Sequence, residues 1–307
     1  MKQASPALKH TKTALERQQT VTGLFFLLPS LALCAVFMIV PLINVFRYSL
    51  TDWDGMSSTY NYVGIYNYLH LHEIEGFKQM MIATIIFAFG ETILVNLVAF
   101  LAALALDKKG RWRVSRGLLR SLWFLPSLLS GAVVGILWRI MYNYHNGVIN
   151  KILVAVGLPK VNWLETVGVA NIATIIGAAW AAIGLCIIVF LAGLQSISPD
   201  LYEAAEIDGA SSGQLLRHIT IPMMAPAITI NVITTTIGAF KAYELPYLIT
   251  NGMPNYTTLL LTQRIFFFGF EAYDYGRGSA LSVILLIIIA LISLLQLIVL
   301  RKREDIF

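Results

Sequence analysis

Six stretches of the sequence are each apolar over the length that crosses a lipid bilayer, and they constrain the fold more than any other feature. A transmembrane helix needs about 20 predominantly apolar residues, and the runs cover residues 22–46, 81–106, 118–142, 169–194, 222–247 and 279–300. The composition agrees, because 57% of the chain is hydrophobic and only 13% is charged, whereas charged residues make up about a quarter of a soluble domain. The sequence therefore predicts an all-α membrane protein with six transmembrane helices.

The distribution of Lys and Arg predicts the side of the membrane on which each end lies. Cytoplasmic segments carry the excess of these residues, and the densest group, between the second and third runs, is Lys108, Lys109, Arg111, Arg113 and Arg116. Together with the basic residues near both ends, this group places the N and C termini in the cytoplasm. We expect a tail over 1–21, a membrane domain over 22–300 and a second tail over 301–307. The net charge of +5 then reflects topology and lipid contact, since no basic groove with interleaved aromatic residues indicates nucleic acid.

The connection between the fourth and fifth runs carries an unusual number of helix start and stop signals. Ser198 is a good N-cap, and Gly209 is a stop residue that adopts the left-handed conformation at low cost. Ser211 followed by Gln214 is a capping box that starts a second helix. The segment 195–221 is therefore predicted to form two short polar helices with a fixed elbow. From these residues alone, a lever that docks a partner and a plain surface loop remain equally compatible.

The same connection carries a longer pattern, which consists of Glu203-Ala204-Ala205, then Asp208-Gly209, then Ile219-Thr220-Ile221-Pro222. Here the chain resembles the inner-membrane permease subunits of binding-protein-dependent ATP-binding-cassette importers, whose signature is Glu-Ala-Ala, three residues, Gly, nine residues and Ile-x-Leu-Pro. The one departure is Ile221, where Leu is usual, and it keeps the side chain aliphatic. The stretches 26–30, 49–53, 193–197 and 248–254 extend the resemblance to the carbohydrate-uptake branch, to the first permease of a maltose- or glycerol-3-phosphate-type pair.

The resemblance implies a non-catalytic half-channel in a bacterial cell membrane. It would pair with a second permease, rest on two ATPase subunits and receive a sugar from an extracellular or periplasmic solute-binding protein. ATP and Mg would bind to the ATPases and no cofactor to this chain, which has no Gly-x-x-x-x-Gly-Lys-Ser/Thr loop. The resemblance also implies a set of residues that transmit ATPase closure: Glu203, Ala204, Ala205, Asp208, Gly209, Ile219 and Pro222.

The fifth run carries a stripe of small residues at which a solute could pass. The stripe repeats at i, i+3, i+4 and i+7 and consists of Thr235, Gly238, Ala239 and Ala242. Small residues are also the usual device for close helix packing in membranes, so both interpretations stand. The resemblance to maltose-type permeases favours substrate contact here and on the fourth run, at Trp180, Ala182 and Leu185.

Glu91 is an ionisable residue near the middle of the second run, where a charge is costly and is usually functional. Three roles are compatible with it: a hydrogen bond inside the bundle, a place in the wall of the substrate pathway, or a proton relay. The third would make the chain a proton-coupled secondary transporter, the main alternative function, although such proteins usually have more spans and inverted repeats. Lys241 and Glu244 lie three residues apart and can pair, and we expect a structural ion pair rather than a clamp on the substrate.

Neither a metal site nor a disulfide is predicted. Cys34 and Cys186 lie inside apolar runs, where cysteine behaves as a small hydrophobic residue, and His145 and His218 have no second ligand at metal-binding spacing. No paired carboxylates and no Ser/His or Cys/His sets indicate a membrane enzyme. The first run is longer than the apolar region of a signal peptide, so we expect it to be retained as a helix.

Overall fold

The computed structural model describes residues 14–107 and 113–304. Every regular secondary-structure element in these ranges is a helix. One isolated β-bridge joins Thr51 to Tyr62. In chain order they are α1 Ala14–Cys34, α2 Val40–Tyr48, α3 Tyr66–Leu69, α4 Phe77–Asp107, α5 Arg113–Phe124, α6 Gly131–Met141, α7 Val148–Ala155, α8 Val169–Gln195, α9 Pro199–Ile207, α10 Ser212–Leu215, α11 Ile221–Met223, α12 Ala225–Phe240, α13 Glu244–Thr250, α14 Leu261–Phe266 and α15 Tyr275–Glu304. Short π-helical or 3₁₀ turns connect several of them.

Four helical stretches are long and apolar enough to cross a membrane without a bend. They are Thr22–Tyr48, α4, α8 and Tyr275–Arg301. Two further spans are bent pairs of helices, α5 with α6 at 104° and α10–α11 with α12 at 65°. The all-α membrane fold is confirmed, and the count reaches six when each bent pair is taken as one span. The third and fifth runs are therefore not the straight helices that their apolar composition predicts.

A proline explains the bend in the third span. Pro126 lies in the 3₁₀ turn Leu125–Leu128 that follows α5. Proline lacks an N–H, and its ring clashes with the preceding turn, so an α-helix does not continue through it unbroken. The Ser130 hydroxyl then accepts a hydrogen bond from the Val133 N–H at 3.4 Å and caps the start of α6. The apolar run contains both signals, but its hydropathy does not reveal them.

The fifth span departs from the prediction at both ends. It bends at Met224, directly before α12, whose first turn contains Pro226. It also ends early, because α12 stops at Phe240 and the separate helix α13 begins at Glu244. The predicted run to residue 247 is thus a helix, a short break and the start of a second helix. Ala242 and the charged residues Lys241 and Glu244 lie in or beside this break.

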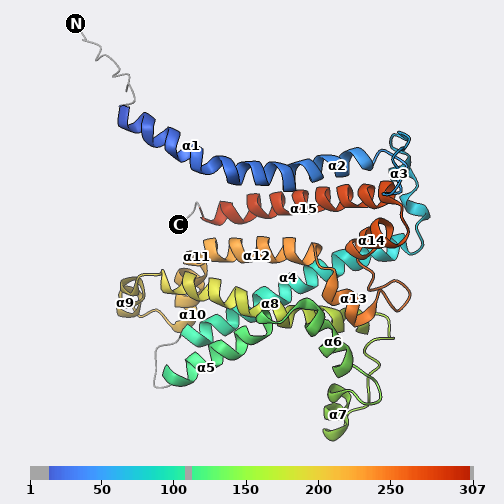
Figure 1. Cartoon of the computed structure of the whole chain (residues 1–307). Helices are drawn as coiled ribbons and strands as arrows, with labels where there is room; N and C mark the ends of the chain where they lie inside the picture. Colours follow the sequence, from blue (N-terminus) through green and yellow to red (C-terminus); the bar gives the residue numbers. More distant parts are fainter. Residues whose placement is uncertain (1–13, 108–112, 305–307) are drawn as a thin grey trace.

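The two central helices are α4 and α8, which cross over much of their length with α12 beside them (Figure 1). The largest buried cluster comes mainly from small and aliphatic side chains on these two helices, including Val95, Ala99, Ala103, Ala179, Ile183, Ile187 and Phe190. Small residues allow two backbones to approach closely, which is how helices associate where lipid removes the hydrophobic drive between them. This pair is the scaffold on which the candidate site is mounted.

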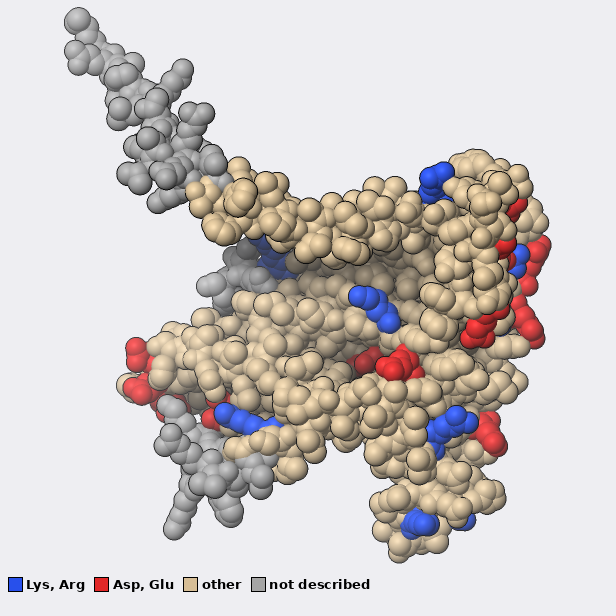
Figure 2. All heavy atoms as spheres, viewed as in Figure 1, with Lys and Arg blue, Asp and Glu red and all other residues tan. Residues whose placement is uncertain are grey.

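The outermost span is the joined α1 and α2, which runs along one edge of the bundle next to α15 (Figure 1). None of its most apolar stretch is buried within the chain. Figure 2 shows the charged residues gathered mostly at the two ends of the molecule, with few across the band between them. A bilayer requires such an apolar band, because charges are costly in its core.

The start of α1, the end of α15 and the short helix α9 lie at the same end of the bundle (Figure 1). This agrees with an even number of crossings. The prediction that this end is cytoplasmic rests on basic residues, several of which fall in 1–13 and 108–112, outside the described residues. The cytoplasmic position of both termini therefore stays a prediction.

Candidate coupling elbow and transport pathway

The helix α9 is closed at both ends by the residues that the sequence singles out. At its start, the Ser198 hydroxyl accepts a hydrogen bond from the Asp200 N–H at 3.3 Å. At its end, Gly209 has a φ of 82°, in the left-handed region. The Gly209 N–H donates to the Glu206 carbonyl at 3.0 Å and the Ala210 N–H to the Ala205 carbonyl at 2.9 Å. These two bonds form a Schellman motif, which satisfies the last carbonyls of the helix and fixes the direction in which the chain leaves it.

The second arm begins immediately after this turn. The Ser211 N–H donates to Gln214 Oε1 at 2.8 Å, which is one half of the predicted capping box. The chain then passes through α10, the π-helical turn Leu216–Thr220 and α11 into α12. We call α9, the turn at Gly209 and the stretch from α10 to α11 the elbow, and we call this last stretch its return arm. Its two arms are joined by residues whose backbone conformation is fixed.

One contact that the sequence did not reveal joins the two arms. The hydroxyl groups of Tyr202 on α9 and Thr220 on the return arm lie 3.1 Å apart in a hydrogen bond. Thr220 is buried, and Tyr202 and Ile219 both pack against the α4–α8 core. The elbow is therefore attached to the membrane domain through its inner face. The sequence gives little sign of the Tyr202–Thr220 hydrogen bond, because a tyrosine and a threonine 18 residues apart do not by themselves indicate a contact.

Removal of this hydroxyl contact is expected to loosen the elbow. A Tyr202→Phe substitution keeps the ring and deletes one hydrogen bond, which is worth about 1 kcal/mol. We expect a lower unfolding temperature of the purified protein and a reduced transport rate. Tyr62→Phe is the matched control, because Tyr62 is exposed near the other end of the bundle. Equal melting temperatures for the two variants would contradict this role.

The outer face of the elbow is exposed and carries one sign of charge. Glu203, Ala204, Asp208 and Gly209 are all exposed, and Ile207 at the tip is 86% exposed. The helix contains acidic residues but no Lys or Arg. Of the other predicted coupling residues, Ala205, Ile219 and Pro222 are half-buried. The predicted set therefore divides into an exposed group on α9 and a group that faces the bundle.

The predicted stripe on α12 also divides. Asn96 of α4 donates a hydrogen bond from Nδ2 to Thr235 Oγ1 at 2.8 Å, and Ala239 is buried. Gly238 is exposed, and a Cβ added there would meet no atom within 4 Å. Ala242 lies in the break after α12 and packs against a buried cluster around Phe87. Close helix packing thus accounts for part of the stripe, and open space adjoins the rest.

The candidate residues on α8 do not converge on a single point. The Trp180 ring meets the Trp138 ring of α6 edge to face, with centroids 5.8 Å apart. Ala182 packs against the α4–α8 core, whereas the Leu185 side chain is exposed. None of the three lines the small pocket between α4, α8 and the segment before α14. Ala182 and Leu185 lie within about 60° of each other around α8, whereas Trp180 lies on the nearly opposite face.

Three charged residues lie near the α12 break or within the bundle. Glu91 Oε2 is buried and has no hydrogen-bond partner among the described residues. The predicted ion pair between Lys241 and Glu244 is wrong, because both side chains are exposed and no such contact forms. Within the described ranges the one ion pair joins Arg277 to Asp274 at 3.3 Å. The break between α12 and α13 is the reason, since the two residues are no longer on one continuous helix.

A polar junction between α4, α12 and α15 was missed by the sequence reasoning. Thr92 donates to Thr236 at 3.4 Å, and Gln296 of α15 donates to the same hydroxyl at 2.9 Å. Asn96 Oδ1 and Gln296 Oε1 remain buried without a partner. Polar side chains on neighbouring membrane helices hold them together by such bonds. Isolated polar residues inside three apolar runs are the signal that would have found this junction.

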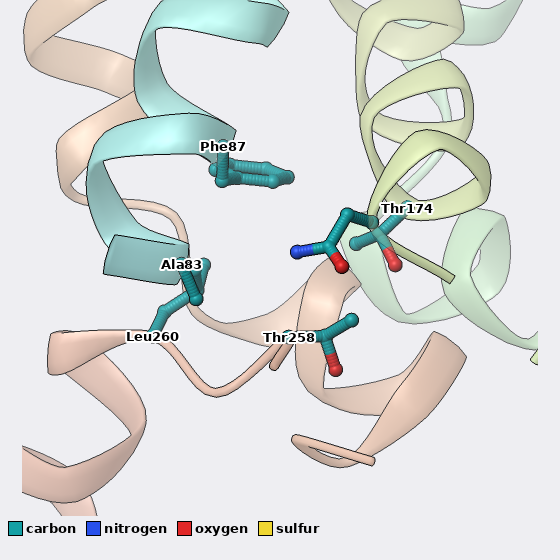
Figure 3. A pocket seen from close by; sticks show the side chains of 6 residues that line it. Ala83, Phe87, Thr174, Thr258 and Leu260 are labelled. Atoms are coloured by element: carbon teal, nitrogen blue, oxygen red, sulfur yellow. The ribbon is translucent and has the colours of Figure 1, made fainter. Parts of the chain in front are cut away.

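Beyond this junction, a small pocket lies between α4, α8 and the segment before α14. Phe87, Thr174 and Thr258 line it together with Ala83, Leu260 and Asn171 (Figure 3). Its volume is about 10 Å³, which is the room that a single water needs. Asn171 closes one side by donating to the Thr257 carbonyl at 2.6 Å. A sugar does not fit this pocket, so it belongs to the packing of the bundle.

Comparison with known proteins assigns this architecture to a family. Residues 96–305 match the family described as the binding-protein-dependent transport system inner membrane component. The chain belongs to this family. The match includes the elbow, the last four spans and the final part of α4, and it confirms the resemblance on the Glu-Ala-Ala pattern. The permease is thus a multi-pass inner-membrane transport component that works with a binding protein, and it is not an enzyme.

Curated relatives and solved structures agree with this assignment. The probable starch degradation products transport system permease protein of Thermoanaerobacterium thermosulfurigenes is 30% identical over 280 residues, which cover 91% of the permease and 94% of that protein. The trehalose/maltose transport system permease protein of Thermococcus litoralis is 32% identical over 295 residues, or 95% and 97% of the two chains. A chain of a bacterial alginate ABC transporter crystal structure superimposes with a TM-score of 0.81 at 22% identity, over 94% of the permease and 96% of that chain. This last likeness concerns the fold.

Proposed function

We propose that the permease is the membrane subunit of an ATP-driven sugar importer. It pairs with a second permease, rests on two ATPase subunits that bind ATP and Mg, and receives its sugar from a solute-binding protein. Its relatives are named as permeases for starch degradation products and for trehalose and maltose, which supports a carbohydrate substrate. The observation that carries the proposal is the elbow. Its exposed acidic helix α9 is capped at both ends, and the chain that follows it leads back into a bent span.

The geometry of the elbow supports a mechanical role in this scheme. A displacement of α9 passes to the return arm through the turn at Gly209 and the Tyr202–Thr220 bond. The return arm continues into α12 across the 65° bend at Met224. Because packed helices shift as rigid elements, closure of the ATPases on the elbow would tilt α12 against α4. The polar junction at Thr236 lies where this tilt is resisted.

The substrate pathway is proposed to follow the exposed side of α12 and α8. Four residues on this side are exposed in the isolated chain: Gly238, Leu185, Lys241 and Glu244. Glu91 has a buried oxygen without a partner among the described residues, and such an oxygen can accept a hydrogen bond from a sugar hydroxyl. A second permease facing these residues would close the other half of the channel.

Affinity purification tests the assembly directly. The tagged permease is extracted from its native membrane in mild detergent, and the proteins that accompany it are identified by mass spectrometry. We expect a second six-span permease and a P-loop ATPase in the purified complex. Recovery of the permease alone or as a homo-oligomer, even after crosslinking, would contradict the proposal.

A further inference from the structure

A continuous row of aromatic rings crosses the end of the bundle opposite the elbow. Neighbouring ring centroids are 5.5, 4.7, 4.7, 6.2 and 5.2 Å apart. In spatial order the rings belong to Tyr247, Tyr243, Phe266, Phe270, Tyr275 and Trp53. We call this row the aromatic track.

The track is assembled from segments that are far apart in the sequence. Its rings come from α13 and the break before it, from α14 and the π-helical turn Phe267–Glu271, from the start of α15 and from the loop after α2. These elements gather at one end of the molecule (Figure 1). Aromatic residues are common at membrane interfaces, where each ring places its polar edge in the headgroup layer. Contact from ring to ring across four segments goes beyond what that role requires.

The track is rigid at the end that adjoins the loop. The Trp53 Nε1–H donates to the Ser57 carbonyl at 2.9 Å, and the Gly276 N–H donates to the Trp53 carbonyl at 3.0 Å. Gly55 has a φ of 85°, and a Cβ there would lie 2.2 Å from the Tyr275 ring. Only glycine allows the loop to close over that ring. Ordered rings bind a ligand face without a large loss of side-chain freedom.

The track is also accessible. Phe270 is 60% exposed and Phe266 is 37% exposed, and the remaining four rings are half-buried. The two most exposed rings carry no polar atom, although they lie at the end of the molecule where the charged loops gather. Exposed apolar rings in a polar setting indicate a binding surface.

A polar pocket adjoins the track beyond Trp53. It has a volume of about 170 Å³ and is lined by Asp52, Asp54, Ser57, Thr59, Tyr60 and Asn61. The centroids of the Trp53 and Tyr60 rings are 6.0 Å apart, so the pocket and the track are continuous. Hydrogen bonds from Ser57 and from the Met56 N–H lower the pKa of Asp54 to about 2. The carboxylate is therefore ionised at neutral pH and accepts hydrogen bonds from hydroxyl groups.

These surfaces together fit one class of ligand. Aromatic faces are electron-rich and attract the polarised C–H groups on the flat side of a pyranose ring, while carboxylate, amide and hydroxyl groups take the sugar hydroxyls. No basic residue lines the pocket, and the two carboxylates disfavour an anionic sugar. The surfaces are complementary to a neutral oligosaccharide.

We propose that the aromatic track is a binding path along which a neutral oligosaccharide moves from the polar pocket to the break between α12 and α13. The path ends at Tyr243, which lies in that break, and at Tyr247 in α13, near Ala242 and the exposed Lys241 and Glu244 in the sequence. The inference rests on the proposed sugar-import function and specifies the substrate class and the route by which it arrives.

The test compares Phe270→Ala with wild type in the reconstituted complex of both permeases, the ATPases and the binding protein. Initial uptake rates are measured with radiolabelled maltose, trehalose and maltotriose over a range of concentrations. Loss of one stacking ring is expected to raise KM roughly threefold to tenfold, most strongly for maltotriose, which covers the most rings. Phe270→Trp should restore the KM, and ATP hydrolysis without sugar should not change.

Tyr62→Ala is the matched control, because Tyr62 is 72% exposed near the same end and pairs with no aromatic ring among the residues that the structure describes. Unchanged uptake by Phe270→Ala, or equal losses in the two variants, would overturn the track. Loss of the second permease from the Phe270→Ala complex would also overturn it, by showing that the rings form a subunit interface. Failure of the wild-type complex to import any of the three sugars would instead contradict the sugar-import function on which the track depends.

Discussion

A Gly209→Val permease is expected to assemble with its partners and hydrolyse ATP, yet to import sugar at roughly one tenth of the wild-type rate. Gly209 holds a φ of 82° at the end of α9, and the left-handed conformation costs a residue with a Cβ about 1–2 kcal/mol, more when it is branched. An energy of 1.4 kcal/mol corresponds to about a tenfold change in an equilibrium. The strain would unwind the Schellman turn and allow α9 to move without displacing the return arm.

The surroundings of Gly209 make this a test of conformation alone. A Cβ added at this position would meet no atom within 4 Å, so the substitution creates no clash. Gly213 is the matched control, since it is equally free of neighbours but lies in α10 with an ordinary helical backbone. Gly213→Val should import sugar normally. Normal import by Gly209→Val, or equal loss in both variants, would contradict a fixed turn in the coupling path.

The second large effect is expected from reversal of charge on the elbow. Glu203 is exposed on a helix that carries acidic residues and no Lys or Arg, so the surface that docks there should be positive. Glu203→Lys places like charges opposite each other and should reduce recovery of the ATPase with the tagged permease by about tenfold. The loss should deepen at low salt, where screening is weakest.

Quantitative co-purification at several salt concentrations measures this effect. Glu73→Lys is the control, because Glu73 is exposed at the opposite end of the bundle and makes the same change in net charge. Undiminished recovery of the ATPase with Glu203→Lys would remove the elbow from the docking surface. Equal losses in the two variants would point to a general effect of net charge.

The elbow is the part of the structure that the sequence predicts best. Ser198, Gly209 and Ser211 act through hydrogen bonds and backbone angles within a few residues, so local chemistry determines the result. The hydrogen bond between Tyr202 and Thr220 depends on how the two arms fold back on each other, and local sequence patterns do not specify that arrangement. The same limit applies to the polar junction, whose members lie on three helices.

The spans are predicted less evenly. Apolar runs locate all six crossings, because a bilayer demands length and hydrophobicity and little else. Hydropathy does not report the bends at Pro126 and Met224 or the break after Phe240. The break separates Lys241 from Glu244 and so removes the ion pair that helical spacing predicts. The aromatic track cannot be predicted from the sequence either, because its rings meet only when four distant segments come together in the fold.

Uptake by sealed proteoliposomes distinguishes ATP-driven import from proton-coupled transport. The purified complex of this permease, its partner permease and the ATPases is reconstituted with the binding protein on the side opposite the elbow and ATP on the elbow side. We expect labelled sugar to accumulate only with hydrolysable ATP, at a rate that a proton uncoupler leaves unchanged. Accumulation without ATP that collapses with the uncoupler would contradict the account and assign the transport to a proton relay through Glu91.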